Sequence, residues 1–270
     1  MLIKPNDRGY VVAWLQTKLG INSDGHYGPL TGAAVRTYQT TKGLTPDGLV
    51  GPSTLAQLGY TPEVVTGHKL TTQDFIRTGQ ELACHPAMVQ AIALKETRGE
   101  AFLSDGRPKI LFERHQFYKR LPVVRKPGQT VAELLMQRDQ LVKNQPNICN
   151  PQAGGYQGGA AEYKRLAAAR IYSDTAALES TSWGQFQVMG FNAVGIGYDS
   201  VQEFVRLMNQ GVDQHLEALS RFIKTNRQAL EAIRARDYRS LALAYNGPRA
   251  PQSYNADLAK YFEQSKNQYA

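Results

Sequence analysis

A short motif that occurs twice near the amino terminus is the strongest constraint on the fold of this chain. Residues 24–31 read DGHYGPLT and residues 47–54 read DGLVGPST, so both follow the pattern D-G-x-apolar-G-P-x-T. The glycines permit tight turns with positive φ, and the proline presets the direction of the chain. Thr31 and Thr54 are then candidates to cap helices that begin at Gly32 and Leu55.

Apolar residues at helical spacing lie before and between the two copies. Together they predict a three-helix unit of roughly 60 residues with two matching turns. On periodicity alone, this unit could also be a helical module without any ligand. The two apolar stripes are Val11, Val12, Leu15 and Leu19, followed by Ala34, Val35, Tyr38 and Gln39.

The same positions resemble the type 1 peptidoglycan-binding domain over about residues 5 to 60. This resemblance implies a three-helix fold that grips wall glycan or stem peptide without cleaving it. The positions that carry it are Val12, Leu15-Gln16, Leu19-Gly20, Asp24-Gly25, Gly28, Thr31, Ala34-Val35, Tyr38-Gln39, Gly43-Leu44, Asp47-Gly48, Gly51-Pro52, Thr54 and Leu58.

Residues 61–70 contain Pro and Gly without a sustained period, which indicates a linker. We therefore expect a first domain over residues 1–65, a linker over 66–71 and a second domain over 72–270. The second domain is predicted to be mostly helical, so the fold class is mainly α. Capping patterns begin at Thr71, Thr130, Ser200 and Thr225, and residues 109–113 form the best candidate strand.

One helix of the second domain carries a carboxylate on its apolar face. It begins near His85-Pro86, and Val89, Ile92, Ala93 and Glu96 follow at spacings i, i+3, i+4 and i+7. Thr97, Arg98 and Gly99 are expected to end it. A carboxyl against apolar surface has a raised pKa, as a general acid needs near neutral pH. The alternative is a Glu at a helix end that is partly exposed or paired with Lys95 or Arg98.

Two further segments have the composition of a sugar cleft. Residues 182–190, SWGQFQVMG, combine aromatic side chains with amides, and Trp183, Gln185 and Gln187 are candidates to bind substrate. Residues 242–248, ALAYNGP, add Tyr245 and Asn246 at a predicted helix end. The alternative is that the aromatic residues of both segments belong to the core.

Together these segments resemble the lysozyme-like superfamily, and most closely the N-acetylmuramidase domain of phage endolysins, over about residues 72 to 268. The resemblance also rests on residues 96–102, 107–115, 154–159 and 182–192. It implies that Glu96 is the catalytic acid and that the enzyme cleaves the β-1,4 bond between N-acetylmuramic acid and N-acetylglucosamine, which leads to lysis of the host cell. It implies no metal and no cofactor. A lytic transglycosylase and a non-catalytic wall-binding phage protein remain as alternatives.

A second catalytic carboxylate is less well defined. Asp105 is the nearest candidate, although Asp-Gly is a turn signal in its own right. Glu113 and Glu179 are weaker candidates, and Thr181 and Ser182 could instead orient a water molecule. The resemblance leaves open that one Glu is sufficient.

Charge and composition limit the partners. The formal net charge is +8, but the Lys and Arg residues are spread out and no nucleic-acid motif occurs, so we expect the anionic wall and not nucleic acid as the partner. The first ten residues lack the apolar region of a signal peptide, and no stretch is apolar enough for membrane insertion. These features fit a monomeric endolysin held in the host cytoplasm until a separate pore releases it to the periplasm and cell wall.

Overall fold

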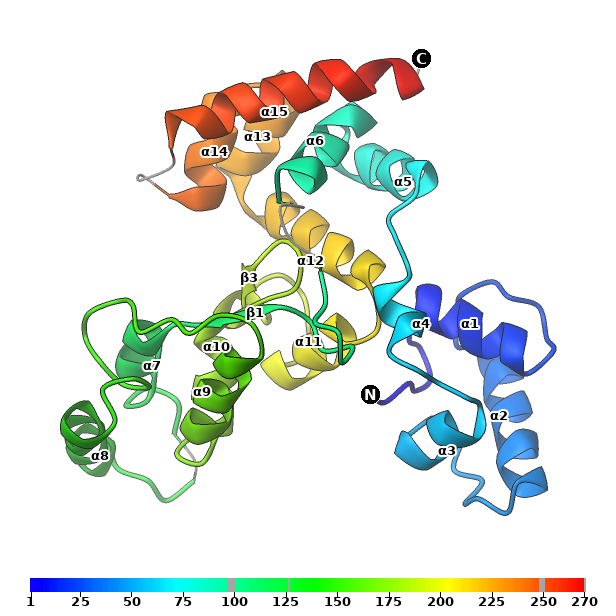
Figure 1. Ribbon diagram of the computed structural model, residues 1–270, viewed down its shortest axis with the longest axis horizontal. Helices are drawn as coiled ribbons and strands as arrows, with labels where there is room; N and C mark the ends of the chain where they lie inside the picture. Colours follow the sequence, from blue (N-terminus) through cyan, green and yellow to red (C-terminus); the bar gives the residue numbers. More distant parts are fainter. Residues whose placement is uncertain (97–100, 126, 248–250, 270) are drawn as a thin grey trace.

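The structure is a computed structural model that describes residues 1–96, 101–125, 127–247 and 251–269. Helices dominate these ranges, and the described strands form one small sheet. Figure 1 shows a small group of N-terminal helices, blue to cyan, beside a larger helical body. The predicted mainly α fold is confirmed.

The N-terminal helices enclose a core of their own. Ile3 and Val50 form an antiparallel bridge that ties the first residues to the middle of the second motif copy. Val12, Leu15 and Tyr27 are fully buried beneath it. The helices are α1 (Tyr10–Lys18), α2 (Pro29–Thr41), α3 (Pro52–Gln57) and the short α4 (Glu63–Thr66).

The repeated motif folds around a buried glutamine in each copy. In the first copy, Gln16 Nε2 donates to Asp24 Oδ1 at 2.7 Å, to the His26 carbonyl at 3.1 Å and to Thr31 Oγ1 at 3.0 Å. Gln16 Oε1 accepts the Gly25 N–H at 2.8 Å. One amide therefore satisfies the polar groups of a whole turn. The second copy repeats these contacts from Gln39 to Asp47, Gly48, Leu49 and Thr54.

The expectation that Thr31 and Thr54 cap helices is wrong. α2 and α3 begin earlier, at a proline, and their N-caps are Gly28 and Gly51 without side-chain caps. Proline suits the first helical position because its missing N–H would have no partner there. Both threonines lie in the first turn and are buried, where their hydroxyls bond to the central glutamine.

The larger body contains the remaining described elements. They are α5 (Thr72–Leu82), α6 (Pro86–Glu96), β1 (Ile110–Phe112), α7 (Arg114–Arg120), α8 (Val131–Asn144), α9 (Ala160–Arg170), α10 (Asp174–Glu179), β2 (Thr181–Trp183), β3 (Val188–Met189), η1 (Gly190–Asn192), α11 (Val201–Met208), α12 (Val212–Thr225), α13 (Arg227–Ala235), α14 (Tyr238–Asn246), α15 (Gln252–Ser265) and η2 (Lys266–Tyr269).

Three of the four expected caps are present. Thr71 and Thr130 form complete capping boxes at the starts of α5 and α8, and Ser200 Oγ accepts the Glu203 N–H at the start of α11. The expectation for Thr225 is wrong, because this residue ends α12. Asn226 caps α13 instead, through its side chain and the Ala229 N–H.

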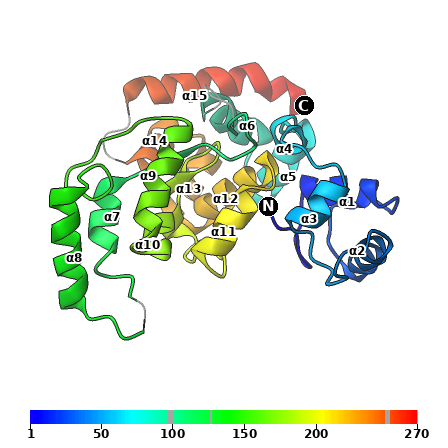
Figure 2. The same cartoon turned by 60° about the horizontal axis from the view of Figure 1, so that its bottom comes forward.

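α12 runs through the middle of the larger body, and α6 packs between α5 and α15 (Figures 1 and 2). The sheet is antiparallel in the order β1-β2-β3, and Ile110 pairs with Trp183. The strand expected over residues 109–113 is therefore present as β1. This arrangement brings the end of α6, the β2–β3 turn and α14 to one place.

Two smaller sequence features also have clear positions. Cys84 is half-buried and Cys149 is buried, and both are free thiols. Burial raises the pKa of the Cys84 thiol to about 12 and that of Cys149 to about 11, so neither is a reactive thiolate near neutral pH.

Within the described ranges no helix is both long and apolar enough to cross a membrane.

Candidate active site

Glu96 is the last described residue of α6, and its carboxyl lies in a partly desolvated environment. Ile92 and Ala93, on the preceding turn, are buried, and Glu96 is half-buried. Desolvation raises the pKa of the Glu96 carboxyl, while a hydrogen bond from Tyr254 and the charge of Lys95 act against that rise. Tyr254 is buried, and its hydroxyl donates to Glu96 Oε1 at 2.7 Å. The carboxyl is thus held in place and tends to keep its proton.

Of the two residues that could pair with Glu96 in a salt bridge, Lys95 and Arg98, the structure describes Lys95. Lys95 forms its ion pair with Asp257 of α15, and its ammonium lies 5.1 Å from the centre of the Tyr254 ring. It is therefore directed at α15, although its charge still acts on Glu96. Arg98 and the expected helix end at Thr97–Gly99 lie outside the described residues.

A small cavity opens at Glu96. Its volume is about 140 Å³, which is smaller than a typical pocket for a whole small-molecule ligand. Glu96 is the only carboxylate among the described residues that line it. The lining residues are Glu96, Phe186, Gln187, Val188, Met189, Asn192, Phe222 and Tyr245.

The turn between β2 and β3 forms one wall of this cavity. Gly184 has a φ of +72° and Gln187 a φ of +49°, so the turn is tight and uses a non-glycine residue in the left-handed region. The side chain of Gln187 fixes its own turn, because Nε2 donates to the Gly184 carbonyl at 2.7 Å and Oε1 accepts from Ser182 Oγ at 2.7 Å. The Tyr245 hydroxyl donates to the Phe186 carbonyl at 2.5 Å. Of the predicted site residues, Glu96, Gln187 and Tyr245 meet at the cavity.

Four other predicted residues lie behind the cavity wall. Trp183 is 2% exposed and donates its indole N–H to the Leu178 carbonyl, so its ring belongs to the core and cannot stack on a sugar in this structure. The Thr181 hydroxyl is fully buried on the Ala177 carbonyl. Gln185 is buried, and Ser182 bonds to Gln187. Asn246 ends α14, and its side chain is outside the described part of the chain.

Asp105 has a different environment from Glu96. Its carboxylate accepts two side-chain hydrogen bonds from Arg107, at 2.9 and 2.7 Å, and these hold its pKa below the usual range. It does not line the Glu96 cavity in the described structure. The next residue, Gly106, faces Pro62 of the N-terminal domain, where a Cβ would lie 3.1 Å from Pro62 Cβ. Asp105 therefore acts here as a turn former at the junction of the domains.

The two weaker candidates are also engaged elsewhere. Glu113 accepts the Tyr156 hydroxyl at 2.8 Å, and Glu179 pairs with Arg120 at 2.8 Å. Neither lines the Glu96 cavity in the described structure.

Sequence reasoning missed Tyr254, Asn192 and Phe222. Tyr254 has the same kind of signal as Glu96, because it begins an apolar stripe with Leu258 and Phe262 at four-residue spacing. A tyrosine in such a stripe predicts a core residue, and only the fold shows that its hydroxyl faces a carboxylate.

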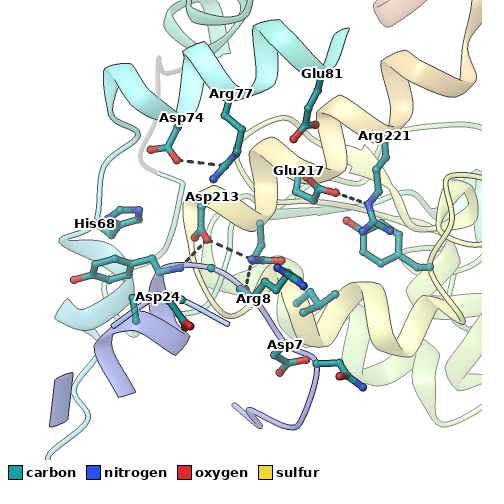
Figure 3. A pocket seen from close by; sticks show the side chains of 18 of the residues that line it. Asp7, Arg8, Asp24, His68, Asp74, Arg77, Glu81, Asp213, Glu217 and Arg221 are labelled. Carbon is teal, nitrogen blue, oxygen red and sulfur yellow. Dashed lines mark hydrogen bonds and ion pairs between the residues drawn. The ribbon is translucent and has the colours of Figure 1, made fainter. Parts of the chain in front are cut away.

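A larger cavity, of about 870 Å³, lies between the N-terminal domain and the larger body. Figure 3 shows it lined by charged side chains from α5, α12 and the N-terminal segment. Two ion pairs, Asp74–Arg77 and Glu217–Arg221, lie within the described lining of this cavity. Among the described residues, no group of three or more His, Cys, Asp or Glu could hold a metal ion.

Comparison with known proteins identifies the family of each part of the chain. The N-acetylmuramidase family matches residues 85–266, and a putative peptidoglycan-binding domain matches residues 8–58. The match covers more than half of the chain, and the chain therefore belongs to the N-acetylmuramidase family, with a mainly helical, lysozyme-like fold and a peptidoglycan-binding domain in front.

A solved structure extends the similarity to the whole chain. The crystal structure of the Burkholderia AP3 phage endolysin is 34% identical in sequence and has a TM-score of 0.65. The alignment covers 100% of this chain and 99% of that one. No curated protein matches the chain.

Proposed function

We propose that this protein is a phage endolysin that hydrolyses the β-1,4 bond between N-acetylmuramic acid and N-acetylglucosamine, with Glu96 as the general acid. The observation that carries the proposal is the position of Glu96. It is a half-buried carboxyl with a raised pKa, and it is the only carboxylate among the described residues of its cavity. Family membership and the similarity to a phage endolysin support the same function.

The chemistry follows from the two protonation states of Glu96. The protonated carboxyl gives its proton to the glycosidic oxygen as the bond to the anomeric carbon breaks and an oxocarbenium-like centre develops. The resulting carboxylate then takes a proton from the water that attacks this centre, so the acid is restored. Tyr254 holds Oε1 throughout, so the other carboxyl oxygen is the one that faces the glycan.

The cavity offers several groups for substrate. Gln187 and Asn192 provide amides for sugar hydroxyl or acetamido groups, and Phe222 and Tyr245 provide ring surface. Asp105, Thr181, Ser182 and Trp183 have no direct role in this proposal, because none of them lines the cavity.

The N-terminal domain would hold the enzyme on the wall. Tethering raises the local concentration of glycan at the catalytic domain without any new contact in the active site. Release of the enzyme to the wall would then lyse the bacterial host.

The test is mass spectrometry of the soluble fragments that the enzyme releases from purified peptidoglycan. We expect fragments with reducing N-acetylmuramic acid ends. Fragments with 1,6-anhydro ends would show a lytic transglycosylase, in which an internal hydroxyl replaces water. Intact glycan with cut stem peptides, or no release at all, would overturn the proposal.

A further inference from the structure

The first turn of α12 holds the N-terminal domain against the larger body. α1 begins after Gly9, which has no side chain to cap the helix. Asp213, which belongs to the larger body, caps α1 instead, because its Oδ2 accepts the Tyr10 N–H at 2.9 Å. Gln214 Nε2 donates to the Arg8 carbonyl at 2.7 Å. Figure 3 shows Asp213 directed from α12 to the start of α1.

These contacts are buried and have apolar support. Asp213 is 7% exposed and Gln214 is 8% exposed. Val212, at the start of α12, and Phe102 pack into the hydrophobic core of the N-terminal domain. A buried carboxylate is costly without donors, and the Tyr10 N–H of the N-terminal domain is one of the donors to Asp213 Oδ2, so the docked position stabilises this side chain.

The next residue of α12, His215, holds the active-site turn. Its ring is fully enclosed: Nε2 donates to the Met208 carbonyl at 2.8 Å, which leaves Nδ1 to accept the Gln185 N–H at 3.1 Å. A Cβ on Gly184 would lie 2.7 Å from the imidazole, so only glycine fits there. Burial lowers the pKa of His215 to about 4, and the ring therefore stays neutral and keeps this acceptor near neutral pH.

The β2–β3 turn that His215 holds is also hydrogen-bonded to α6, the helix that carries Glu96. Gln185 Nε2 donates to the Ala93 carbonyl at 3.4 Å, on the helical turn that precedes Glu96. Phe186, Gln187, Val188 and Met189 then form the wall of the cavity. In addition, Phe102 stacks on the His215 ring with centres 4.8 Å apart. One turn of α12 thus contacts α1 through Asp213, the segment just before α1 through Gln214, and the active-site turn through His215.

We propose that His215 is a positioning residue through which the docked N-terminal domain sets the geometry of the Glu96 cavity. The wall-binding domain is then a part of the catalytic unit as well as an anchor. This inference rests on the proposed function of Glu96, and its tests use a soluble glycan oligosaccharide, for which tethering to the wall gives no advantage.

Two substitutions of His215 separate positioning from packing. His215→Asn keeps an acceptor near the place of Nδ1, whereas His215→Gln keeps the donor near Nε2 and loses the acceptor for Gln185. Asn is the smaller residue and leaves the larger void, so packing alone predicts that it is the worse variant. Positioning predicts the reverse: kcat falls about tenfold in His215→Gln and at most about threefold in His215→Asn, with KM nearly unchanged. Equal kcat values, or a lower kcat in His215→Asn, would overturn the proposal.

A second pair of variants tests the link to the N-terminal domain. Asp213→Ala removes the acceptor for Tyr10, and we expect kcat on the soluble oligosaccharide to fall about fivefold. Glu217→Gln is the matched control, because Glu217 lies one turn further on the same cavity and bonds only to Arg221 among the described residues. It should keep kcat within about twofold of wild type. Wild-type kcat in Asp213→Ala would show that docking does not reach the active site.

The proposed function is tested separately by Glu96→Gln. An active Glu96→Gln enzyme means that the function assigned to Glu96 fails. An inactive Glu96→Gln enzyme combined with wild-type kcat in both Asp213→Ala and His215→Gln means that only the coupling fails. Melting temperatures of all variants are measured beside kcat, and assays are run well below them.

Discussion

Glu96 and Asp105 lie close together in the sequence, yet their surroundings give them opposite properties. Glu96 ends the described part of a buried helix and lies in a small cavity, where desolvation raises the pKa of its carboxyl. Asp105 lies in an exposed turn, where hydrogen bonds from Arg107 hold its pKa down. The first is suited to give up a proton near neutral pH, and the second is suited to remain a charged structural anion.

Glu162 shows that burial alone does not decide this difference. Its side chain is fully buried, and desolvation raises its pKa. Four groups lower this pKa by more than desolvation raises it: the N–H groups of Gln157, Gly158 and Phe112, and the charge of Arg165. The net result is a lowered pKa. Within the described ranges, the hydrogen bond that opposes the desolvation of Glu96 comes from Tyr254. The donors that face the carboxylate, and not its depth alone, decide the direction of the pKa shift here.

The largest expected effect is on Glu96 itself. Glu96→Gln removes the proton donor, and we expect glycan cleavage to fall on the order of 10³-fold or more. Binding to purified wall should be unchanged, because the N-terminal domain is intact. The measurement is release of soluble fragments beside sedimentation with the wall, and retained cleavage would remove Glu96 from the mechanism.

Tyr254→Phe should have the next largest effect. The Tyr254 hydrogen bond lowers the pKa of Glu96, so its loss raises that pKa further and moves the alkaline limb of the activity profile to higher pH. Loss of positioning should also lower kcat about tenfold. Tyr269→Phe is the control, since that hydroxyl donates to Gln90 in the middle of α6 and not to Glu96. A limb that moves to lower pH would contradict the assignment of the Tyr254 bond.

Asp105→Asn should have little effect on cleavage. Because Asp105 is paired with Arg107 and does not line the cavity, we expect kcat within about threefold of wild type on soluble oligosaccharide. A loss comparable to that in Glu96→Gln would mean that Asp105 is a second catalytic carboxylate after all.

The smallest expected effects are on stability, where Glu96→Gln and Asp105→Asn should shift Tm near neutral pH in opposite directions. The raised pKa of Glu96 means that its contribution to stability is present at low pH and is lost as pH rises through the folded pKa. Glu96→Gln should therefore raise Tm near neutral pH and leave it nearly unchanged below pH ~4.

For Asp105 the sign is reversed. Its lowered pKa contributes stability above the unfolded pKa that is lost as pH falls through the folded value. Asp105→Asn should slightly lower Tm near neutral pH, and the difference should vanish in acid. Scanning calorimetry of both variants at two pH values checks the pair, and shifts of the same sign at neutral pH would contradict the comparison.

The sequence predicted the local features of this molecule better than the site. Helical spacing placed Glu96 on an apolar face, and the repeated motif predicted two matching turns. Tyr254 could not be assigned to Glu96, because it comes from a helix 158 residues away in the chain. Composition predicts Trp183 in the cleft, but it is buried in the core; β2 has only three residues, which is too short for alternation to show which side chains face the core.

The caps show the same limit. Thr71 and Thr130 cap as expected because the whole motif is local. Thr31 and Thr54 do not, because Gln16 and Gln39 bind them from another helix. Local chemistry is readable from the sequence, whereas a partner brought in by the fold is not.

The most direct test of the central claim is a titration of the Glu96 carboxyl by carbon-detected NMR, with the resonance assigned from Glu96→Gln. We predict that Glu96 titrates above the ordinary carboxyl range while Asp105 titrates below it, and that the Glu96 value coincides with the alkaline limb of kcat/KM on a soluble oligosaccharide. A Glu96 carboxyl that titrates at or below the ordinary value, or an activity profile that does not follow it, would contradict its role as the general acid.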